Sequence, residues 1–418
     1  MEDIYIKGIK IRKVRHLQNL SIDVLSDGET RRHLILTGSN GCGKTSLLRA
    51  IQTYLYSVSN ANEPYQSRRF LTSVQNTLEN VKKKDDHNLI DDLKKNISHY
   101  EDNIQKSTAG LDLEFSKDPT EIKSAFEHGN FVLSYFGAMR SFHSPEPEHV
   151  DKVFLKDHYS IKESTSSVFL SYLLDLKMTQ ALAIVKKDNR KAGEIEEWFD
   201  GLQAILRDIY NDRSLRLEFN EDTFRFNILA QNREPFDFNT ASDGFSAIFD
   251  IIIDLILRMQ QQDKRITKFL VPGVVLIDEI ESHLHLELQK RVLSILTKLF
   301  PNIQFIVTTH SPFVLNSIAN ATVYDLERHV LLKKGLSDAS YSGIVEGYFN
   351  QDELSSDLRT KLNEYRSLTQ KRVLENDDYM QIALLETSLD EIPDYLESAI
   401  SAEYHKLKLE FTAREDIA

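Results

Sequence analysis

Apolar residues recur along this chain with two different periods, and the first stretch has the two-residue period of β-strands. Residues 4–25 alternate in this way and predict a β-hairpin or two separate strands. The apolar run 33–37 predicts a short buried strand, and residues 45–56 then have the spacing of a helix. A strand and a helix are therefore expected on either side of residues 38–44.

Residues 66–108 carry two helical stripes, separated by the charged segment 82–86. Their apolar residues lie three or four positions apart: Leu71, Val74, Leu78 and Val81, then Leu89, Leu93, Ile97, Tyr100 and Ile104. This spacing predicts an antiparallel helical hairpin, a short coiled-coil-like arm. Two ordinary helices lying on a core would give the same pattern.

The rest of the chain alternates strands with helices, which predicts an α/β fold. Strands are expected at 111–115, 131–136, 273–277, 303–308, 323–326 and 330–333, a β-hairpin at 215–229, and helices over most of 164–210 and at 244–260 and 286–299. The loop 141–149, with two prolines, marks a boundary. Two final helical stripes run from Leu354 through Leu358, Leu362 and Tyr365 to Leu368, and from Ile382 through Leu385, Leu389 and Ile392 to Tyr395.

These elements divide the chain into four segments. Residues 1–58 and 214–344 form one α/β head, which is interrupted by a helical insertion at 59–213. The insertion holds the hairpin 66–108, a helical lobe at 150–212 and the strands between them. Residues 345–418 form a helical tail, predicted to be a docking module made of a helical hairpin; packing of the same stripes on the head is the alternative.

Composition and charge narrow the class of protein. No run approaches the ~18 apolar residues that span a bilayer, and the acidic N-terminus does not resemble a signal peptide, so we expect a cytoplasmic protein without a membrane partner. The single cysteine, Cys42, rules out an internal disulfide. The net charge is −13, and residues 345–418 hold 17 acidic and 8 basic residues, a net of −9. A basic strip at Lys7, Lys10, Arg12, Lys13 and Arg15 keeps a nucleic-acid partner open.

The pattern G-x-x-x-x-G-K-[ST] occurs at residues 38–45 and predicts a phosphate-binding loop. Its members, with the following serine, are Gly38, Ser39, Asn40, Gly41, Cys42, Gly43, Lys44, Thr45 and Ser46. The glycines let main-chain N–H groups approach phosphate oxygens, and the start of the following helix adds positive potential. Lys44 supplies a cation for the β- and γ-phosphates of ATP, and the Thr45 hydroxyl is a Mg²⁺ ligand.

Residues 274–279 form an apolar run that ends in two carboxylates, as in a Walker B strand. Asp278 is expected to hold Mg²⁺, and Glu279 to act as the general base on the attacking water. A strand that ends in two carboxylates is weak evidence by itself. Because the chain also has a phosphate loop at a suitable separation in sequence, the prediction of a Walker B strand is specific.

Two further motifs resemble those of ABC ATPases. Residues 308–312 follow a buried strand and resemble the histidine switch, with His310 contacting the γ-phosphate. Residues 240–245 precede a helix and resemble the signature motif, in which Ser242 and Gly244 bind ATP held by a second copy. Two departures are Asp243 in place of glycine and Phe245 in place of glutamine or glutamate.

Together these motifs are similar to the RecF/SMC/OLD branch of ABC ATPases, above all to stand-alone ATPases of bacterial anti-phage systems such as Septu PtuA and retron-linked relatives. The resemblance covers residues 1–58 and about 214–335. It implies ATP and Mg²⁺ as cofactors, a dimer formed around ATP, Arg15 near the nucleotide, and Arg140 at the place of the missing Q-loop glutamine. It also implies that residues 283–285 form the D-loop.

Several histidines suggest metal sites, but their spacing argues against them. His283 and His285 lie two residues apart, which would not bring both to one ion on a helix. His143 and His149 share a loop with Glu146, Glu148 and Asp151, in an arrangement better explained as a solvated polar loop. His158 has no potential ligands beside it.

ABC-type ATPases serve in four kinds of role, and the sequence favours two of them. We expect an ATPase that controls a separate effector, a nuclease chain, in an anti-phage complex. A RecF/SMC-like DNA repair or maintenance ATPase is the alternative. A transporter motor is disfavoured because 196 residues (46–241) separate the phosphate loop from the signature. An OLD-type nuclease would need an Asp-x-Asp motif after His310, and there is none.

Overall fold

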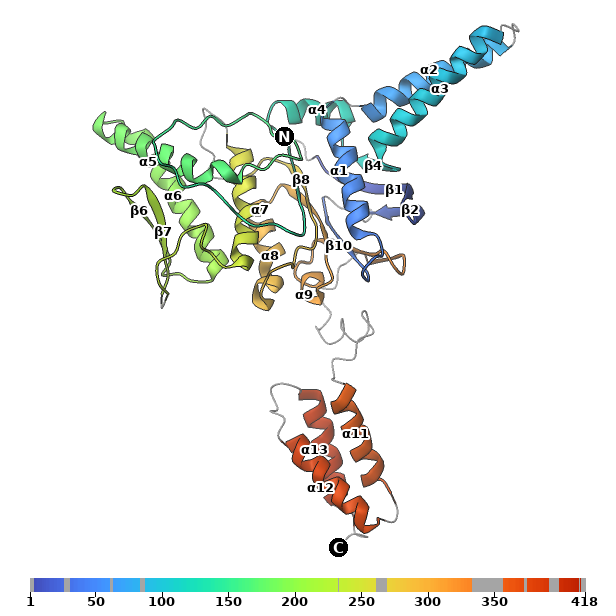
Figure 1. The fold of residues 1–418 in the computed structure, drawn as a ribbon, viewed down its shortest axis with the longest axis vertical. Helices are drawn as coiled ribbons and strands as arrows, with labels where there is room; N and C mark the ends of the chain where they lie inside the picture. Colours follow the sequence, from blue (N-terminus) through green and yellow to red (C-terminus); the bar gives the residue numbers. More distant parts are fainter. Residues whose placement is uncertain are drawn as a thin grey trace. The chain divides into compact units, whose positions relative to one another are not determined.

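A computed structural model of the chain describes residues 4–25, 31–60, 63–82, 87–231, 233–260, 269–332, 356–371, 374–390, 398–412 and 414. The chain divides into two compact units, Met1–Ala339 and Ser340–Ala418, each with its own helices (Figure 1). The first unit contains every strand in the described part of the chain.

A six-stranded mixed sheet forms the centre of the first unit, in the order β11-β10-β3-β9-β8-β5. Its strands are β3 (His33–Thr37), β5 (Val132–Phe136), β8 (Gly273–Ile277), β9 (Ile303–Thr308), β10 (Ala321–Asp325) and β11 (Val330–Leu332). All neighbours are parallel except the edge pair of β10 and β11. The predicted α/β fold is confirmed, and the carboxyl ends of five parallel strands share one edge.

A second, antiparallel sheet has the order β2-β1-β4, with β1 (Ile6–Val14), β2 (Leu17–Asp23) and β4 (Leu111–Phe115). The predicted hairpin at 4–25 is β1 paired with β2. Helix α1 (Lys44–Asn60) shares one apolar core with both sheets. The fully buried Gln304 of β9 joins the sheets, since its amide oxygen accepts from the N–H of Ile6 and its amide nitrogen donates to the carbonyl of Ile6.

Helix α4 (Pro119–Glu127) packs on α1 and was not predicted. Its start has a recognisable signal, because the Asp118 side chain accepts from the N–H of Thr120 and Pro119 occupies the first turn. An Asp-Pro pair before an apolar helix face is a common N-terminal signature.

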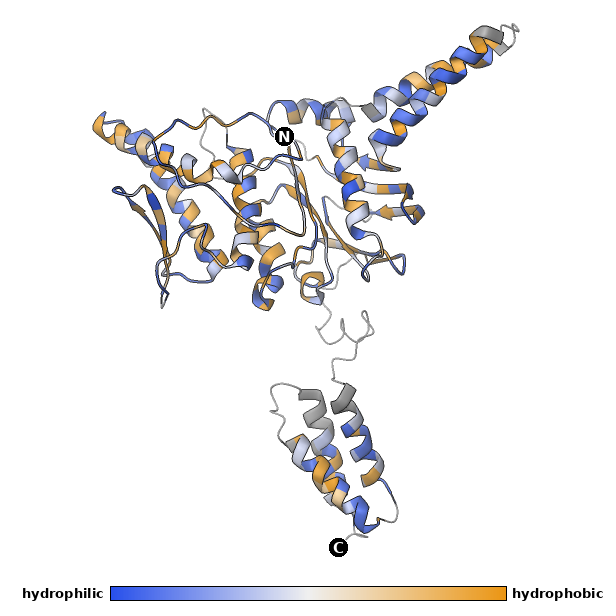
Figure 2. Ribbon diagram, viewed as in Figure 1, coloured by the Kyte–Doolittle hydropathy of each residue, from blue (hydrophilic) through white to orange (hydrophobic). Residues whose placement is uncertain are grey.

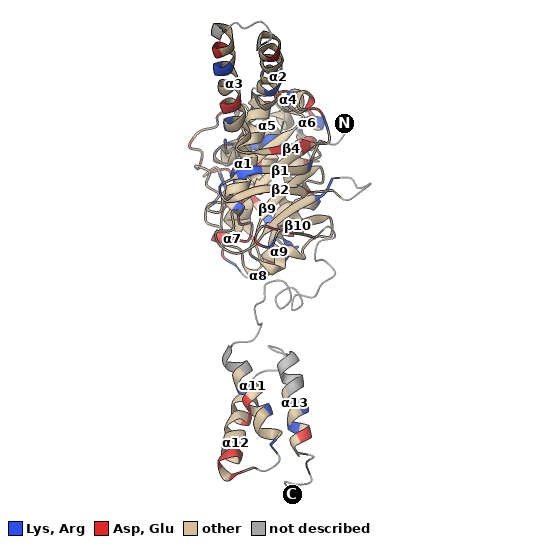
Figure 3. Cartoon of the chain, turned by 90° about the vertical axis from the view of Figure 1, so that its right-hand side faces the viewer, with Lys and Arg blue, Asp and Glu red and all other residues tan. Residues whose placement is uncertain are grey.

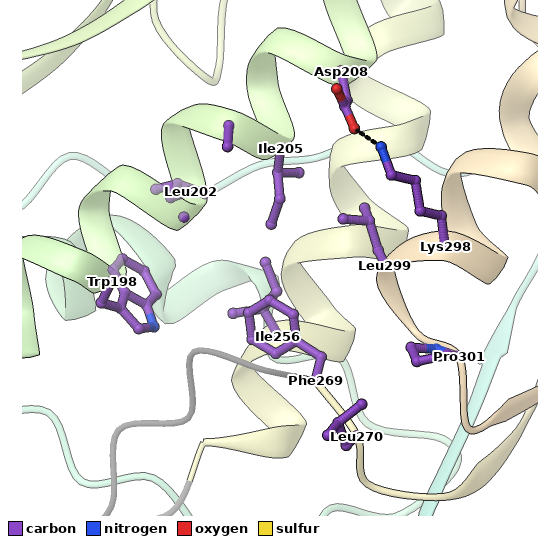
Figure 4. A pocket seen from close by; sticks show the side chains of 12 residues that line it. Trp198, Leu202, Ile205, Asp208, Ile256, Phe269, Leu270, Lys298, Leu299 and Pro301 are labelled. Atoms are coloured by element: carbon purple, nitrogen blue, oxygen red, sulfur yellow. Dashed lines mark hydrogen bonds and ion pairs between the residues drawn. The ribbon is translucent and has the colours of Figure 1, made fainter.

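The predicted helical hairpin is present as α2 (Glu63–Lys82) and α3 (His87–Thr108). Both views show the hairpin standing away from the sheets as an arm (Figures 1 and 3). The two helices pack mainly on each other, and Phe70 stacks on Tyr100 with ring centroids 5.7 Å apart. The alternative, two helices lying on a core, does not describe this segment.

Helices α5 (Phe169–Val185) and α6 (Asn189–Tyr210) form an antiparallel pair beside the small hairpin of β6 (Arg216–Asn220) and β7 (Arg225–Leu229). Helices α7 (Asp243–Met259) and α8 (Leu286–Leu299) lie between this lobe and the six-stranded sheet. The lobe is therefore tied to the sheet through these two apolar helices.

Helix α5 is unusually apolar. With the preceding 3-10 turn it spans Ser166–Val185, 20 residues that include an 18-residue stretch of mean hydropathy 1.5, so by length and composition alone it could cross a membrane (Figure 2). The core helix of a globular protein can have the same length and composition, and Phe169, Leu173 and Leu174 of α5 are buried in the unit. One such helix is weak evidence for a membrane.

The second unit consists of α11 (Ser356–Thr369), α12 (Asn376–Asp390) and α13 (Ser398–Thr412). The expected two-helix hairpin was incomplete, because α13 supplies Tyr404 and Leu407 to the same core. The other buried members are Leu362, Tyr365, Leu368, Ile382 and Leu389. Of the predicted stripes, Leu354, Ile392 and Tyr395 and the side chain of Leu358 lie outside the described residues.

We expect residues 340–418, produced alone, to be helical and to melt cooperatively, because the three helices make their own core. Tyr365→Ala removes a fully buried ring. Loss of a buried aromatic ring costs about 3–5 kcal/mol, as much as a core of this size supplies, so the variant should unfold. Tyr379→Ala, at a ring that is 41% exposed, is the control. Circular dichroism melts compare the three proteins, and a non-cooperative melt of the unchanged segment would contradict the assignment.

Candidate nucleotide site

The loop between β3 and α1 has the backbone conformation that its glycines allow. Gly38, Gly41 and Gly43 have φ angles of 132°, 85° and 103°, a region that side chains with a Cβ rarely adopt. A Cβ on Gly43 would also lie 3.1 Å from Leu17 and 3.2 Å from His16. The loop therefore wraps tightly over the start of α1 and against the turn between β1 and β2.

Lys44 lies inside this loop and is 6% exposed. Its Nζ donates to the carbonyl oxygens of Gly38 and Ser39, at 2.8 and 2.9 Å. Ser39, Asn40 and Gly41 are exposed at the rim, and Ser46 is half-buried in the first turn of α1. Among the described residues, the only oxygen atoms bonded to this buried ammonium are those of neutral carbonyls. An anionic oxygen, such as that of a phosphate, would form a stronger hydrogen bond with it.

Asp278 joins three elements at the carboxyl edge of the sheet. It follows β8, is 3% exposed, and its Oδ1 accepts from the hydroxyls of Thr45 (3.1 Å) and Thr308 (2.7 Å). The predicted Mg²⁺ ligands Thr45 and Asp278 are therefore neighbours across the sheet. Hard oxygen donors of this kind, few in number and next to a phosphate loop, fit Mg²⁺.

Glu279 has a left-handed backbone with φ of 45°, which costs about 1–3 kcal/mol in a residue with a side chain. The surroundings hold it there: its N–H donates to the Thr308 hydroxyl (2.7 Å), and its Oε2 accepts from Ser282 (3.1 Å). The carboxylate predicted to be the general base is thus half-buried beside Asp278.

The switch residues after β9 are held by a carboxylate that the sequence did not assign. Glu281 accepts from the Thr309 hydroxyl (2.7 Å) and from the N–H of His310. Burial and the charge of Lys44 lower the pKa of His310, so its ring is neutral near pH 7. The charge of Lys44 acts on the His310 ring, so the ring lies near the phosphate loop. A neutral imidazole there can donate one N–H to a ligand bound in the loop.

Ser242 and Gly244 lie at the start of α7, apart from this assembly. Ser242 and Asp243 are exposed, whereas Gly244 is buried against residues 283–284, where an added Cβ would lie 2.8 Å from the His283 oxygen. The described contacts join this motif to the predicted D-loop and not to residues 38–45. His283 and His285 are exposed, and the described residues contain no metal-binding group of three or more His, Cys, Asp or Glu.

The β1–β2 turn contacts the phosphate loop through His16, and the place of Arg15 near the nucleotide stays a prediction. Arg15 is exposed, with a left-handed φ of 53°, and its neighbour His16 makes the contact: His16 Nε2 lies 3.0 Å from the Cys42 oxygen. On the other side, the Glu327 carboxylate accepts from the N–H of Ser39 (3.0 Å), which lowers the pKa of Glu327. The His16–Cys42 and Glu327–Ser39 contacts join segments that are far apart in sequence, so no local sequence pattern predicts them.

Arg140 does not take the nucleotide-facing place expected of a Q-loop residue. It is 8% exposed, and its terminal guanidinium nitrogens donate to main-chain carbonyls of Gly137 and of residues 278–280. The side chain therefore lies beneath the Asp278–Glu279 segment.

A family model described as "AAA domain, putative AbiEii toxin, Type IV TA system" matches residues 34–316. The chain belongs to this family of ATPase domains. The matched range contains the phosphate loop, the Asp278–Glu279 pair and His310, so the family assignment and the site coincide.

The curated relatives carry ATPase and Septu names. The retron Ec83 probable ATPase of Escherichia coli is 37% identical over 132 residues, 30% of this chain and 24% of that protein. Septu protein PtuA of Bacillus mycoides is 24% identical over 76% of this chain and 40% of its own length. PtuA of Bacillus thuringiensis is 24% identical over 76% of this chain and 74% of its own length. The predicted resemblance is confirmed, although the match takes in less than half of the first two relatives.

Among solved structures, an Smc head bound to the C-terminal winged-helix domain of ScpA aligns with 80% of this chain and 100% of its own. The identity is 14% and the TM-score 0.37, too low for the alignment to decide a shared fold.

We expect Lys44→Ala to abolish binding of a fluorescent ATP analogue, because the substitution removes the cation inside the loop while the apolar core stays intact. Lys298→Ala, an exposed lysine paired with Asp208 at 2.7 Å outside the loop, is the control and should bind normally. Fluorescence titration and circular dichroism on the same samples separate loss of binding from loss of fold. Normal affinity in folded Lys44→Ala would refute the assignment of the loop.

Proposed function

We propose that this protein binds ATP with Mg²⁺ and hydrolyses it, as an ATPase of the ABC type. The observation that carries the proposal is the meeting of Lys44, Thr45, Asp278 and Glu279 at one edge of the sheet, through the Thr45–Asp278 and Thr308–Asp278 hydrogen bonds. When bound, Mg²⁺ would offset the negative charge of the β- and γ-phosphates between Thr45 and Asp278.

Each residue has a distinct part in this reaction. The loop N–H groups and Lys44 bind and orient the phosphates, with Lys44 exchanging the carbonyls of Gly38 and Ser39 for phosphate oxygens. Glu279 accepts the proton of the attacking water, and His310 donates its N–H to the γ-phosphate. Burial of Asp278 and Lys44 keeps water from screening these charges.

We infer that the active form is a homodimer around ATP. Ser242 and Gly244 are suited to an anion because the N–H groups of the first turn of α7 have no partners within the helix, yet Gly244 lies against residues 283–284 of its own chain and Ser242 is exposed. A second copy that presents its Ser242 to the phosphate loop of the first copy would complete the nucleotide site. By two-fold symmetry, Ser242 of the first copy would complete the site of the second.

The biological role that best fits is control of a separate effector, a nuclease chain, in a cytoplasmic anti-phage complex. The retron and Septu relatives support this role. The unit Ser340–Ala418, with its own core and an acidic sequence, is suited to dock a basic partner. A DNA repair or maintenance ATPase is the second candidate, because the α2–α3 arm projects from the head as coiled-coil arms do and the β1 strip is basic.

Glu279→Gln should retain ATP and stop hydrolysis, because glutamine keeps the shape of the side chain and cannot accept the proton. Turnover should fall by about 100-fold or more, and ATP with Mg²⁺ should trap a dimer. The double variant Glu279→Gln/Ser242→Arg should stay monomeric, since an arginine on the exposed start of α7 blocks the second copy. Analytical ultracentrifugation compares the two proteins, and equal sizes would argue against a dimer built through Ser242.

A further inference from the structure

We infer that Arg140 is a positioning residue for ATP hydrolysis: it fixes the main chain of residues 278–280 and thereby aims the Glu279 carboxylate. The inference rests on the proposed ATPase activity. It assigns Arg140 a task different from that of the Q-loop residue whose place it occupies in the sequence.

The contacts of Arg140 are concentrated on three consecutive carbonyls. Nη1 donates to the oxygens of Gly137 and Asp278, both at 2.9 Å. Nη2 donates to the oxygens of Glu279 (3.2 Å) and Ile280 (2.8 Å). One planar group thus binds the end of β5 to the whole turn that follows β8.

Arg140 adds side-chain donors to a turn that already has main-chain bonds. The N–H groups of Asp278 and Ile280 donate to Phe136 and Thr308 of the neighbouring strands, and the N–H of Ser282 donates to the Glu279 carbonyl. Its carbonyls converge on one side, and Glu279 is the residue with the left-handed φ of 45°. The Thr308 hydroxyl accepts from the N–H of Glu279, and Arg140 donates to the carbonyl of Glu279. The peptide groups on both sides of Glu279 are therefore held by hydrogen bonds. If the carbonyl contacts were lost, Glu279 could relax to an ordinary backbone conformation and its carboxylate would turn away from the Thr45–Asp278 pair.

A guanidinium suits this place better than any other side chain. Its rigid fork presents several N–H groups in one plane, whereas a lysine ammonium offers three donors on a flexible stem. Burial lowers the pKa of the Arg140 guanidinium, and the negative charges of Glu281, Asp250, Asp278 and Glu279 act in the opposite direction. Both terminal nitrogens are already committed to carbonyls, so their contact with nucleotide would require these bonds to break. The remaining nitrogen, Nε, is buried and makes no hydrogen bond within the described residues.

The segment that carries Arg140 is itself anchored beyond the arginine. The N–H of Phe142 donates to Ser246 of α7 (2.9 Å). Ser144 and Asn239 exchange two hydrogen bonds, of 3.0 and 2.8 Å. Arg140 therefore sits on a fixed support that runs from the carboxylate turn to the loop before Ser242, and its position is set independently of any ligand.

The test compares Arg140→Lys with Arg258→Lys. Arg258 is a buried arginine that also donates to main-chain carbonyls, those of Leu133, Tyr159 and Ser160, away from residues 278–280. Misplacement of a catalytic group by about 1 Å costs on the order of 100-fold, so kcat of Arg140→Lys should fall by about 10- to 100-fold. We expect changes of no more than about threefold in KM, in the Mg²⁺ requirement and in the affinity for a fluorescent ATP analogue. The reason is that Arg140 does not contact ATP, so binding of the substrate is unaffected. Arg258→Lys should lower the melting temperature and leave kcat per folded molecule unchanged.

Arg140→Ala with added guanidinium chloride supplies a second readout. A free guanidinium ion that refills the cavity should restore part of kcat, and guanidinium should not raise the kcat of Arg258→Ala. A raised KM or Mg²⁺ requirement with unchanged kcat in Arg140→Lys would show that Arg140 touches nucleotide and would overturn the inference. Unchanged kinetics in folded Arg140→Lys would overturn it while leaving the ATPase proposal intact, whereas absence of ATP turnover in the unchanged protein would overturn both.

Discussion

The site depends on one buried carboxylate. Asp278 is 3% exposed, and a carboxylate removed from water is stable only where hydrogen bonds replace hydration. The two hydroxyls that do so, from Thr45 and Thr308, come from the first turn of α1 and the end of β9. Because three strands must stay in register for these bonds to form, the phosphate loop, the carboxylate turn and the switch residues are placed by a single constraint.

The layers of the fold explain why this constraint can be met. The strands that end at the site are buried along their whole length, between the α1 core and the layer of α7 and α8. Such strands cannot slide without exposing apolar side chains, so their carboxyl ends are fixed relative to one another. The exposed start of α7 belongs to the same unit, and its described contacts are with residues 283–284 and not with the phosphate loop, which is why the proposed reaction needs two copies.

Much of this arrangement could be predicted from the sequence, because the signals were local. The glycine loop, the apolar run ending in Asp278 and Glu279, and the strand before His310 each combine a motif with its flanking elements. Helix α4 was missed although Asp118 and Pro119 mark its start, and α13 was missed because its apolar residues show no clear helical stripe. The hydrogen-bond partners of Arg140 could not be predicted. They are the carbonyls of Asp278, Glu279 and Ile280, about 140 residues away, and every residue type has a main-chain carbonyl, so no sequence pattern marks these partners. The same holds for His16 and Glu327, which meet the phosphate loop only in the folded chain.

We propose that the loop at residues 38–45 binds ATP and that Lys44 is its phosphate-binding cation. The most direct test is an experimental structure of the full chain with a non-hydrolysable ATP analogue and Mg²⁺. We expect Lys44 Nζ to leave the Gly38 and Ser39 oxygens for the phosphates, with the metal between Thr45 and Asp278. A nucleotide bound elsewhere, with both carbonyl bonds of Lys44 intact, would contradict it.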